Sequence, residues 1–350
     1  MLNRGASPAV PGGLLALLAA TLFGISTPLV QRFGIGFGPF STAALLYAGA
    51  AMAGALLRQP VEVEARLRRA DSGRLVAMAA FGAVIGPVAL AWGLQHTSGT
   101  SASLMLTLEA LFTAVLAWVL YRETMDRRVW AAMLLLLAGG AVLVLDQGRG
   151  GDAGMWGLLA VLLATAAWGV DNTLSRALAE RDPGQVVLAK SVMGAAATAV
   201  VAVVLDEPAP AFARALALFV TGAAGYGLSL RFYLLAQRAF GAARTGSVFA
   251  FAPFIGAALA VALGDRSAGG MMAVGSLLML AGVVLHLAES HGHEHDHGEV
   301  EHEHAHRHDD GHHDHVHEPM PAGPHSHLHR HTPIRHTHPH VPDAHHIHPP

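Results

Sequence analysis

The stretch "LVAMAAFGAVIGPVALAWGL", residues 75–94, contains twenty residues and no charged side chain. About 20 apolar residues are enough for an α-helix to cross the hydrocarbon core of a bilayer, so the stretch predicts a membrane-spanning helix. Nine further runs of similar length and composition occur before residue 290. All ten runs lie at residues 14–30, 40–57, 75–94, 100–120, 129–145, 156–175, 186–205, 215–236, 246–263 and 271–288.

Ten such runs leave too little polar surface for a soluble globule, and at this length only helices satisfy backbone polar groups inside lipid. The predicted fold class is therefore an all-α membrane protein with about ten transmembrane helices. With the N-terminus inside, thirteen arginines fall on the inner side and four in the outer loops. This positive-inside asymmetry places both termini, including residues 1–13, in the cytoplasm. Cleavage of residues 1–24 as a signal peptide would leave nine spans and put the C-terminus outside.

The helices repeat at a nearly constant distance along the chain. Residues 14–29 resemble the segment 145 positions later, and residues 114–139 resemble the segment 143 positions later. The chain therefore divides into two five-helix repeats, residues 14–145 and 146–288. An odd number of spans makes the second copy enter the membrane from the opposite side. Inverted repeats of this kind build secondary transporters whose central site opens to each side in turn. The sequence has no P-loop motif, which argues against an ATP-driven pump.

Two segments resemble one transporter family. "LTLEALFTAVLAWVLYRETMDRRVWAAMLLLLAGGAVLVL" (106–145) and "FAFAPFIGAALAVALGDRSAGGMMAVGSLLMLAGVVLHL" (249–287) are similar to the end of an EamA repeat of the drug/metabolite transporter (DMT) superfamily. The pairs "FG" (23, 24) and "WG" (168, 169) resemble the aromatic-glycine pair that opens each repeat. The resemblance covers residues 14–288. It implies ten helices and transport of small organic solutes, often export of amino acids or other metabolites.

The chain departs from this family pattern in the fourth helix of each repeat, where the family often carries Glu-Pro. Here Glu109 precedes Ala110 in the first copy, and Ala252 precedes Pro253 in the second. The glutamate and the helix-kinking proline are therefore in different repeats, so the family resemblance does not identify the solute.

Ionisable side chains inside the predicted spans are the best candidates for a solute or coupling site, because each costs about 2.5–3.5 kcal/mol or more at the bilayer centre. Glu109 lies in the middle of the fourth span and is expected to bind a proton or a cationic group. The alternative is a structural hydrogen bond to a neighbouring helix. Asp171 and Asn172 lie in the sixth span, where Asp171 could instead pair locally with Arg176.

Two basic residues complete the candidate set. Lys190 is the only lysine of the chain, and Arg231 lies in the eighth span. Each falls near a predicted cytoplasmic helix end, so snorkelling to the interface is an alternative to solute binding. Aromatic side chains that could line a cavity, or sit at the membrane interface instead, are Tyr47, Trp92, Trp168 and Tyr226.

The segment after residue 290 has a different composition. Only His96 and His286 precede it, so 22 of the 24 histidines lie in this tail, among acidic, glycine and proline residues. The tail has few apolar residues to bury, which predicts a disordered cytoplasmic segment over residues 289–350. Neutral imidazole binds zinc, nickel and cobalt. The expected metal ligands are His291, His293, His295, His297, His302, His304, His306, His308, His312, His313, His315 and His317.

Three functions compete. The first is export of a small organic metabolite, an amino acid or a similar solute, by a protein whose tail binds divalent metal. The second is efflux of nickel, cobalt or zinc, with the tail collecting the ion. The absence of cysteine and the few intramembrane histidines and carboxylates disfavour that function. The third is metal storage, for which ten spans are too elaborate an anchor.

We expect a multi-pass protein of a bacterial inner (plasma) membrane with no enzymatic activity. No cofactor is expected to be required, and nickel, cobalt or zinc would be bound on the tail. The expected partners are a small solute, divalent metal ions and the lipid bilayer, without nucleic acid. A homodimer is compatible with this fold class.

Overall fold

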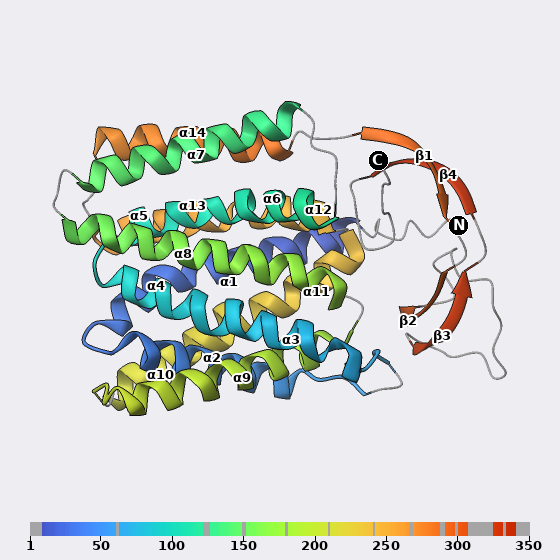
Figure 1. The fold of residues 1–350 in the computed structure, drawn as a ribbon, viewed down its shortest axis with the longest axis horizontal. Coiled ribbons are helices and arrows are strands. Elements are labelled where there is room, and N and C mark those ends of the chain that lie inside the picture. Colours follow the sequence, from blue (N-terminus) through green and yellow to red (C-terminus); the bar gives the residue numbers. More distant parts are fainter. Residues whose placement is uncertain are drawn as a thin grey trace, which may run out of the picture.

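The structure is a computed structural model in which helices form the membrane body and short strands occur in the tail (Figure 1). It describes residues 9–60, 63–121, 127–148, 152–178, 181–208, 211–240, 242–265, 269–287, 291–297, 300–306, 325–331 and 334–340.

The first half of the body forms from α1 to α7, with one π-helical segment and two 3-10 turns. Pro87 lacks the N–H that would bond to the carbonyl four residues earlier, and the π-helical segment η2 ends just before it. In chain order the elements are α1 (Ala9–Gly34), α2 (Pro39–Leu56), η1 (Arg69–Asp71), α3 (Ser72–Met78), η2 (Ala79–Ile85), α4 (Gly86–Leu94), α5 (Gly99–Met105), η3 (Leu106–Leu108), α6 (Glu109–Tyr121) and α7 (Arg127–Gly148).

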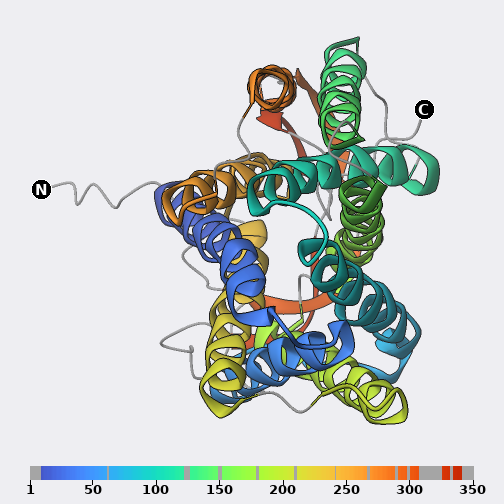
Figure 2. The same ribbon diagram turned by 90° about the vertical axis from the view of Figure 1, so that its left-hand side faces the viewer.

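The second half repeats this order, and its π-helical segment η5 again lies in the third membrane-spanning stretch. The elements are α8 (Asp152–Ser175), η4 (Arg176–Leu178), α9 (Pro183–Val204), α10 (Phe212–Gly222), η5 (Ala223–Leu228), α11 (Ser229–Phe240), α12 (Ala242–Phe249), α13 (Ala252–Ala262) and α14 (Gly270–Leu287). Seen end-on, helices of both halves surround the centre of the bundle (Figure 2).

Length and composition bear out the predicted membrane body. Within the described residues, nine helical stretches are long and apolar enough to cross a bilayer, and the tenth predicted span is a shorter apolar helix at Gly270–Leu285. Large apolar side chains face outward, such as Leu134 at 64% exposure and Val203 at 80%. So much exposed apolar surface is unusual for a soluble monomer and fits a lipid-facing surface. The all-α membrane fold with two repeat-like halves is confirmed.

Close helix contacts recur with the spacing of the sequence repeat. A Cβ atom on Gly24 would lie 3.1 Å from Cβ of Ile255, and one on Gly169 would lie 2.7 Å from Cβ of Phe112. The two glycines occupy equivalent positions of the two repeats, and so do their two partners. Small residues let membrane helices approach closely. The same contact therefore joins the two halves twice, with the roles of the halves exchanged.

A second repeated contact holds α7 against α14, which lie side by side at one edge of the bundle (Figure 1). A Cβ on Gly139 would lie 2.6 Å from Cγ of Met279, and one on Gly282 would lie 3.0 Å from Cγ of Leu136. Here too the glycines are equivalent in the two repeats, as are their partners. The last helix of each half thus packs against the other through equivalent residues.

In the tail, the structure has four strands where the sequence predicts disorder. They are β1 (His291–His297), β2 (Val300–His306), β3 (His325–His331) and β4 (Ile334–His340). β1 pairs antiparallel with β4, and β2 with β3. The alternation of histidine with other residues has the two-residue period of a strand, which accounts for the difference. The expected ligands His308, His312, His313, His315 and His317 lie outside the described residues.

Candidate functional site

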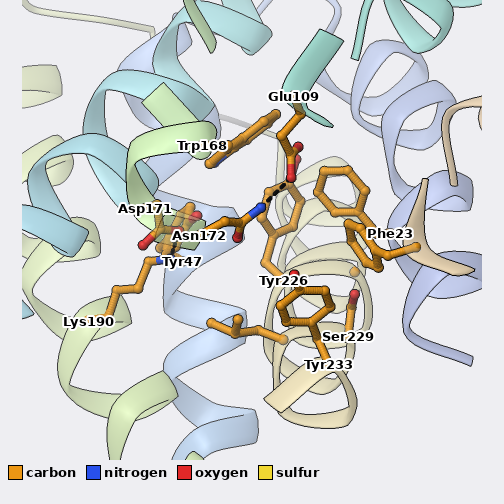
Figure 3. Close-up of a pocket in the computed structure, with 13 residues that line it drawn as sticks. Phe23, Tyr47, Glu109, Trp168, Asp171, Asn172, Lys190, Tyr226, Ser229 and Tyr233 are labelled. Carbon is orange, nitrogen blue, oxygen red and sulfur yellow. Dashed lines mark hydrogen bonds and ion pairs between the residues drawn. The ribbon is translucent and has the colours of Figure 1, made fainter. Parts of the chain in front are cut away.

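A pocket is lined by side chains from both halves of the helical body (Figure 3). The empty space inside it is about 460 Å³, part of it open to solvent. Its lining residues are Phe23, Tyr47, Glu109, Trp168, Asp171, Asn172, Lys190, Gly225, Tyr226, Ser229, Leu230, Tyr233 and Phe249.

One polar contact in the pocket joins Glu109 to Asn172. Glu109 is the first residue of α6, directly after the tight 3-10 turn η3, and Asn172 lies in the last two turns of α8. The Asn172 side-chain amide donates a hydrogen bond to Oε1 of Glu109 (Figure 3). The contact crosses from the second half to the first. The intramembrane carboxylate is therefore held by a neutral group and retains its second oxygen as an acceptor.

A buried ion pair forms a second polar contact. Lys190 of α9 donates through Nζ to Oδ2 of Asp171 in α8, and the two residues are 3% and 4% exposed. Within the described residues, Oδ1 of Asp171 has no hydrogen-bond partner. Buried polar atoms are nearly always paired, so a single unpaired carboxylate oxygen calls for an explanation. Because Asp171 lines the pocket, that oxygen is a natural acceptor for a bound ligand.

The π-helical segment η2 packs directly against the ion pair. A Cβ on Gly82 would lie 2.2 Å from Oδ2 of Asp171 and 2.7 Å from Nζ of Lys190, so no larger residue fits there unless the pair moves. The Gly82 carbonyl accepts from the hydroxyl of Tyr47 and, at 3.0 Å, from Nε1 of Trp168. Segments of π-helix often occur at functional sites. The first half thus supplies the backbone that orders the charged pair of the second half.

The equivalent contact in the other half is neutral. Gly225 is the counterpart of Gly82 in the second repeat, and Ser26 is the counterpart of Asp171 in the first. A Cβ on Gly225 would lie 2.4 Å from Cβ of Ser26. The two contacts correspond in the inverted repeats, but only one carries a carboxylate. The charged part of the pocket therefore lies on one side of the pseudo-symmetric site.

Aromatic rings form the remaining wall. The ring centroid of Phe23 lies 5.6 Å from Trp168, 5.9 Å from Tyr226 and 5.3 Å from Phe249. The ring of Tyr233 lies 5.0 Å from that of Phe249. Such rings contact apolar groups, and their faces attract cations. The pocket thus combines an apolar wall with fixed charges of both signs.

Four of the five solute or coupling residues predicted from the sequence meet here: Glu109, Asp171, Asn172 and Lys190. Lys190 is buried and pairs with Asp171, so the snorkelling alternative for it does not hold. Arg231, the fifth, is not among the pocket residues. Its Nη1 donates to the backbone oxygen of Leu57 at 2.7 Å, at the C-terminal end of α2.

Sequence reasoning did not identify several pocket residues. Ser229, Leu230 and Tyr233 lie on α11, and Phe249 is the last residue of α12. The sequence holds only an indirect signal for them. The repeat aligns Gly225, in the segment directly before α11, with Gly82 of the first half. The aromatic candidate Trp92 lies elsewhere, stacked on His96 with ring centroids 4.0 Å apart.

Metal ligands are not grouped within the part of the body that the structure describes. No set of three or more histidine, aspartate or glutamate side chains there could hold a metal ion. The tail side chains fall outside that observation. The pocket chemistry is that of hydrogen bonds, one ion pair and aromatic contacts.

Comparison with known proteins identifies the family. The model of the EamA-like transporter family matches residues 10–145 and again residues 155–288. An "Uncharacterized transporter" of Methanothermobacter thermautotrophicus is 27% identical over 296 residues, which cover 78% of this chain and 85% of that protein. A protein crystal structure aligns with a TM-score of 0.58 at 19% identity, over 79% of this chain and 97% of that one, and shows the same fold. The chain belongs to the EamA-like transporter family, within the drug/metabolite transporter superfamily.

Proposed function

We propose that the protein is a secondary transporter that exports a small organic solute, an amino acid or a close analogue, through the pocket between its halves. The observation that carries this proposal is the unpaired Oδ1 of Asp171 beside Lys190. A buried ion pair is costly to desolvate and is stabilised by further hydrogen bonds from a ligand. A solute with both an ammonium and a carboxylate group would provide them.

The chemistry of the pocket supports a defined orientation for such a solute. Its carboxylate would lie near Lys190, whose ammonium has three donors. Its ammonium would be accepted by Oδ1 of Asp171 and by Glu109. Its side chain would contact the aromatic wall, where Phe23 and Phe249 offer apolar surface. Each end of the solute thus meets a group of opposite charge or matching polarity.

Coupling to a proton is assigned to Glu109, which is an intramembrane carboxylate in contact with the neutral amide of Asn172. Ionisable residues in this position commonly act in proton relays. Entry of a proton from outside would neutralise Glu109 and release the solute's ammonium group. Departure of the proton to the inside would restore the binding site.

The tail is assigned the separate task of binding divalent metal on the cytoplasmic side of a bacterial inner membrane. Its histidine content supports this function. Nickel, cobalt or zinc bound there would be buffered at the membrane surface. Efflux of the metal itself is the second candidate, supported by the same tail, but the body offers no matching ligand group within its described side chains.

The test is uptake into inside-out vesicles from cells that express the full chain. Vesicles receive labelled neutral amino acids one at a time, a labelled carboxylate without an amino group, or labelled nickel, cobalt and zinc. We expect proton-dependent uptake of at least one amino acid, and its loss in Asp171→Asn and Lys190→Gln. Arg74→Gln, which changes an exposed arginine outside the pocket, is the control.

Two outcomes would contradict the proposal. Uptake of metal without any amino acid, abolished by Glu109→Gln, would assign the protein to metal efflux. Amino acid uptake that persists in both pocket variants would place the solute site elsewhere.

A further inference from the structure

Side chains from both halves meet at the inner end of the bundle, defined here as the end where α2, α8 and α11 terminate. Arg238 donates through Nη1 to both carboxylate oxygens of Glu64, at 2.8 and 2.7 Å, and through Nη2 to the backbone oxygen of Arg181. The Nε of Arg181 lies 3.1 Å from Oδ2 of Asp71. Two ion pairs therefore connect the first half to the second.

Backbone contacts draw the same segments together. The amide of Asp182, just before α9, donates to the oxygen of Ala65 at 2.8 Å. The amide of Leu67 donates to Oε1 of Gln185 at 3.2 Å. Glu64 is only 8% exposed in this arrangement. A carboxylate at that depth needs its basic partner, because a buried charge left alone is strongly destabilising.

The opposite, outer end contains the pseudo-symmetric counterparts of this pair. Glu207 in the second repeat corresponds to Glu64 in the first, and Gln95 in the first corresponds to Arg238 in the second. Glu207 follows α9 and Gln95 follows α4, and both side chains contact the chain around the start of α2. The corresponding place in the second repeat is the start of α9. The two ends of the protein thus use equivalent positions with different side chains.

One hydrogen bond is common to the two turns, although its donor differs. Gln95 donates through Nε2 to the backbone oxygen of Phe37 at 2.9 Å, and Arg238 donates to that of Arg181. Phe37 and Arg181 are equivalent, because each lies two residues before the proline that opens α2 or α9. The outer donor is a neutral amide and the inner donor is a guanidinium. Only the inner donor can therefore form an ion pair with the neighbouring glutamate.

The residue directly before the helix also differs between the two turns. At the inner turn, Oδ1 of Asp182 caps α9 by accepting from the amide of Gly184 at 2.8 Å. At the outer turn the corresponding residue is Gly38, where a Cβ would lie only 1.9 Å from the carboxyl carbon of Glu207. Glu207 fills that space.

From this position Glu207 caps α2. Its carboxylate accepts from the amides of Phe40 at 3.2 Å and Ser41 at 2.7 Å. A carboxylate on the first amides of a helix is favoured by hydrogen bonding and by the helix dipole. The outer contact between the halves is thus a helix cap, whereas the inner one is an ion pair.

We infer that these two sets are the gates of the transporter: the Arg238–Glu64 pair closes the inner end, and Glu207 on the N-terminus of α2 closes the outer end. Because their chemistry differs, each gate opens independently when one side chain is changed. This inference rests on the proposed transport function, in which the pocket opens to each side in turn.

The inner gate and the pocket share α11. Ser229, Leu230 and Tyr233 of this helix line the pocket, and Arg238 lies near its end. The π-helical segment η5 precedes α11 and separates it from α10. A movement of α11 that breaks the pair with Glu64 would therefore also move one wall of the pocket. This arrangement links occupancy of the site to the inner gate.

The absence of cysteine from the chain allows a direct test. Leu230→Cys places a single thiol in the pocket of the full-length protein. A membrane-impermeant thiol reagent is applied to inside-out vesicles, which expose the inner end, and to right-side-out vesicles, which expose the outer end. The rate of labelling from each side is compared in the Arg238→Gln, Glu207→Gln and Arg74→Gln backgrounds. Arg74 is the matched control, because it is an exposed arginine near the start of α3, at the same end as Arg238.

We expect Arg238→Gln to raise labelling in inside-out vesicles about tenfold, because it leaves Glu64 buried without its partner. Labelling of the same variant from outside should change little. Glu207→Gln should show the reverse pattern, because an amide offers one acceptor oxygen where the carboxylate offers two. Arg74→Gln should change neither rate. Adding Glu64→Gln to Arg238→Gln should recover part of the closure, which shows that the single variant remained folded.

The inference is overturned if Arg238→Gln labels from inside at the rate of the control, or if either variant raises both rates equally. Labelling requires no solute. If the gates respond as expected but no amino acid is taken up by vesicles, the proposed solute fails while the assignment of the gates stands.

Discussion

Asp171 and Lys190, both in the second half, form a buried ion pair against Gly82 of the first half. The glycine backbone is close enough that any Cβ would overlap both charged groups. The same residue offers its carbonyl to Tyr47 and Trp168. Gly82 is thus the point at which the π-helical segment of one half fixes the charges of the other.

Gly82→Ala is expected to lower the stability of the protein by about 1–3 kcal/mol, the usual cost of overpacking a closely packed site. It should also reduce solute uptake, because the pair must move away from the added methyl group. Thermal unfolding in detergent and vesicle uptake measure the two effects. Gly73→Ala is the control, since nothing lies within 4 Å of a Cβ at that position. Equal melting temperatures for the two variants would contradict the close packing at Gly82.

Lys190→Met is expected to destabilise the protein by about 3–5 kcal/mol, because it leaves the Asp171 carboxylate buried without a partner. The double variant Asp171→Asn with Lys190→Met should recover most of that loss, since neither charge remains. Solute uptake should be absent in both. A double variant that is no more stable than Lys190→Met would show that the cost comes from packing and not from charge. Uptake by the double variant would remove the pair from the solute site.

The inner gate is expected to close more firmly as the pH falls. Burial raises the pKa of Glu64, and Arg238 only partly offsets that effect. Opening would expose Glu64 and return its pKa toward the ordinary value of about 4.3. The closed gate therefore binds the proton more tightly, so acidification favours closure in the range between the two pKa values.

The Leu230→Cys reporter measures this effect in inside-out vesicles. Acidification slows labelling in any case, because it protonates the reacting thiol. We expect a further decrease in the labelling rate from closure of the gate, and this further decrease should be absent in Glu64→Gln. The charged groups that act on Glu64 are Arg238, Asp182 and Arg231, so Arg231→Gln should preserve the direction of the effect. Labelling that accelerates on acidification would reverse the assignment, because it would mean that protonation opens the gate.

The sequence predicted the ten-span body, the inverted halves, and four polar and three aromatic residues of the pocket. The length of the apolar runs predicts the spans, because backbone polar groups inside lipid must be satisfied within a helix. Charged side chains within the spans predict the pocket, because a charge in the membrane faces a cavity or a partner. The pairings themselves could not be predicted. Glu64 and Arg238 lie far apart in the chain, in different repeats, and nothing local in either segment identifies its partner. Arg231 was predicted as a site residue because it is a basic residue within the eighth predicted span, yet its side chain bonds to the end of α2.

Glu109→Gln is expected to separate solute binding from proton coupling. The amide can still contact Asn172 but cannot take up a proton, so exchange of labelled solute across the membrane should continue while uptake against a gradient stops. Counterflow and proton-driven uptake in the same vesicles measure the two activities. Asp146→Asn, which neutralises a carboxylate near the end of α7, outside the pocket and both gates, controls for loss of charge. Uphill uptake by Glu109→Gln would assign coupling to another group, with Asp171 the next candidate.

Cutting the chain after residue 289 tests the tail independently of the pocket. The full chain should bind several nickel ions at about pH 7.5 by calorimetry and the cut chain few or none, because the cut removes nearly all of the 24 histidines. Binding to the full chain should weaken as the pH falls through about 6.5, where imidazole becomes protonated and its lone pair is lost. Amino acid uptake by the cut chain should be unchanged if the tail only buffers metal. If the full chain lowers cell nickel and both the cut and Glu109→Gln prevent this, the pocket and tail act on one cargo, and metal efflux replaces solute export.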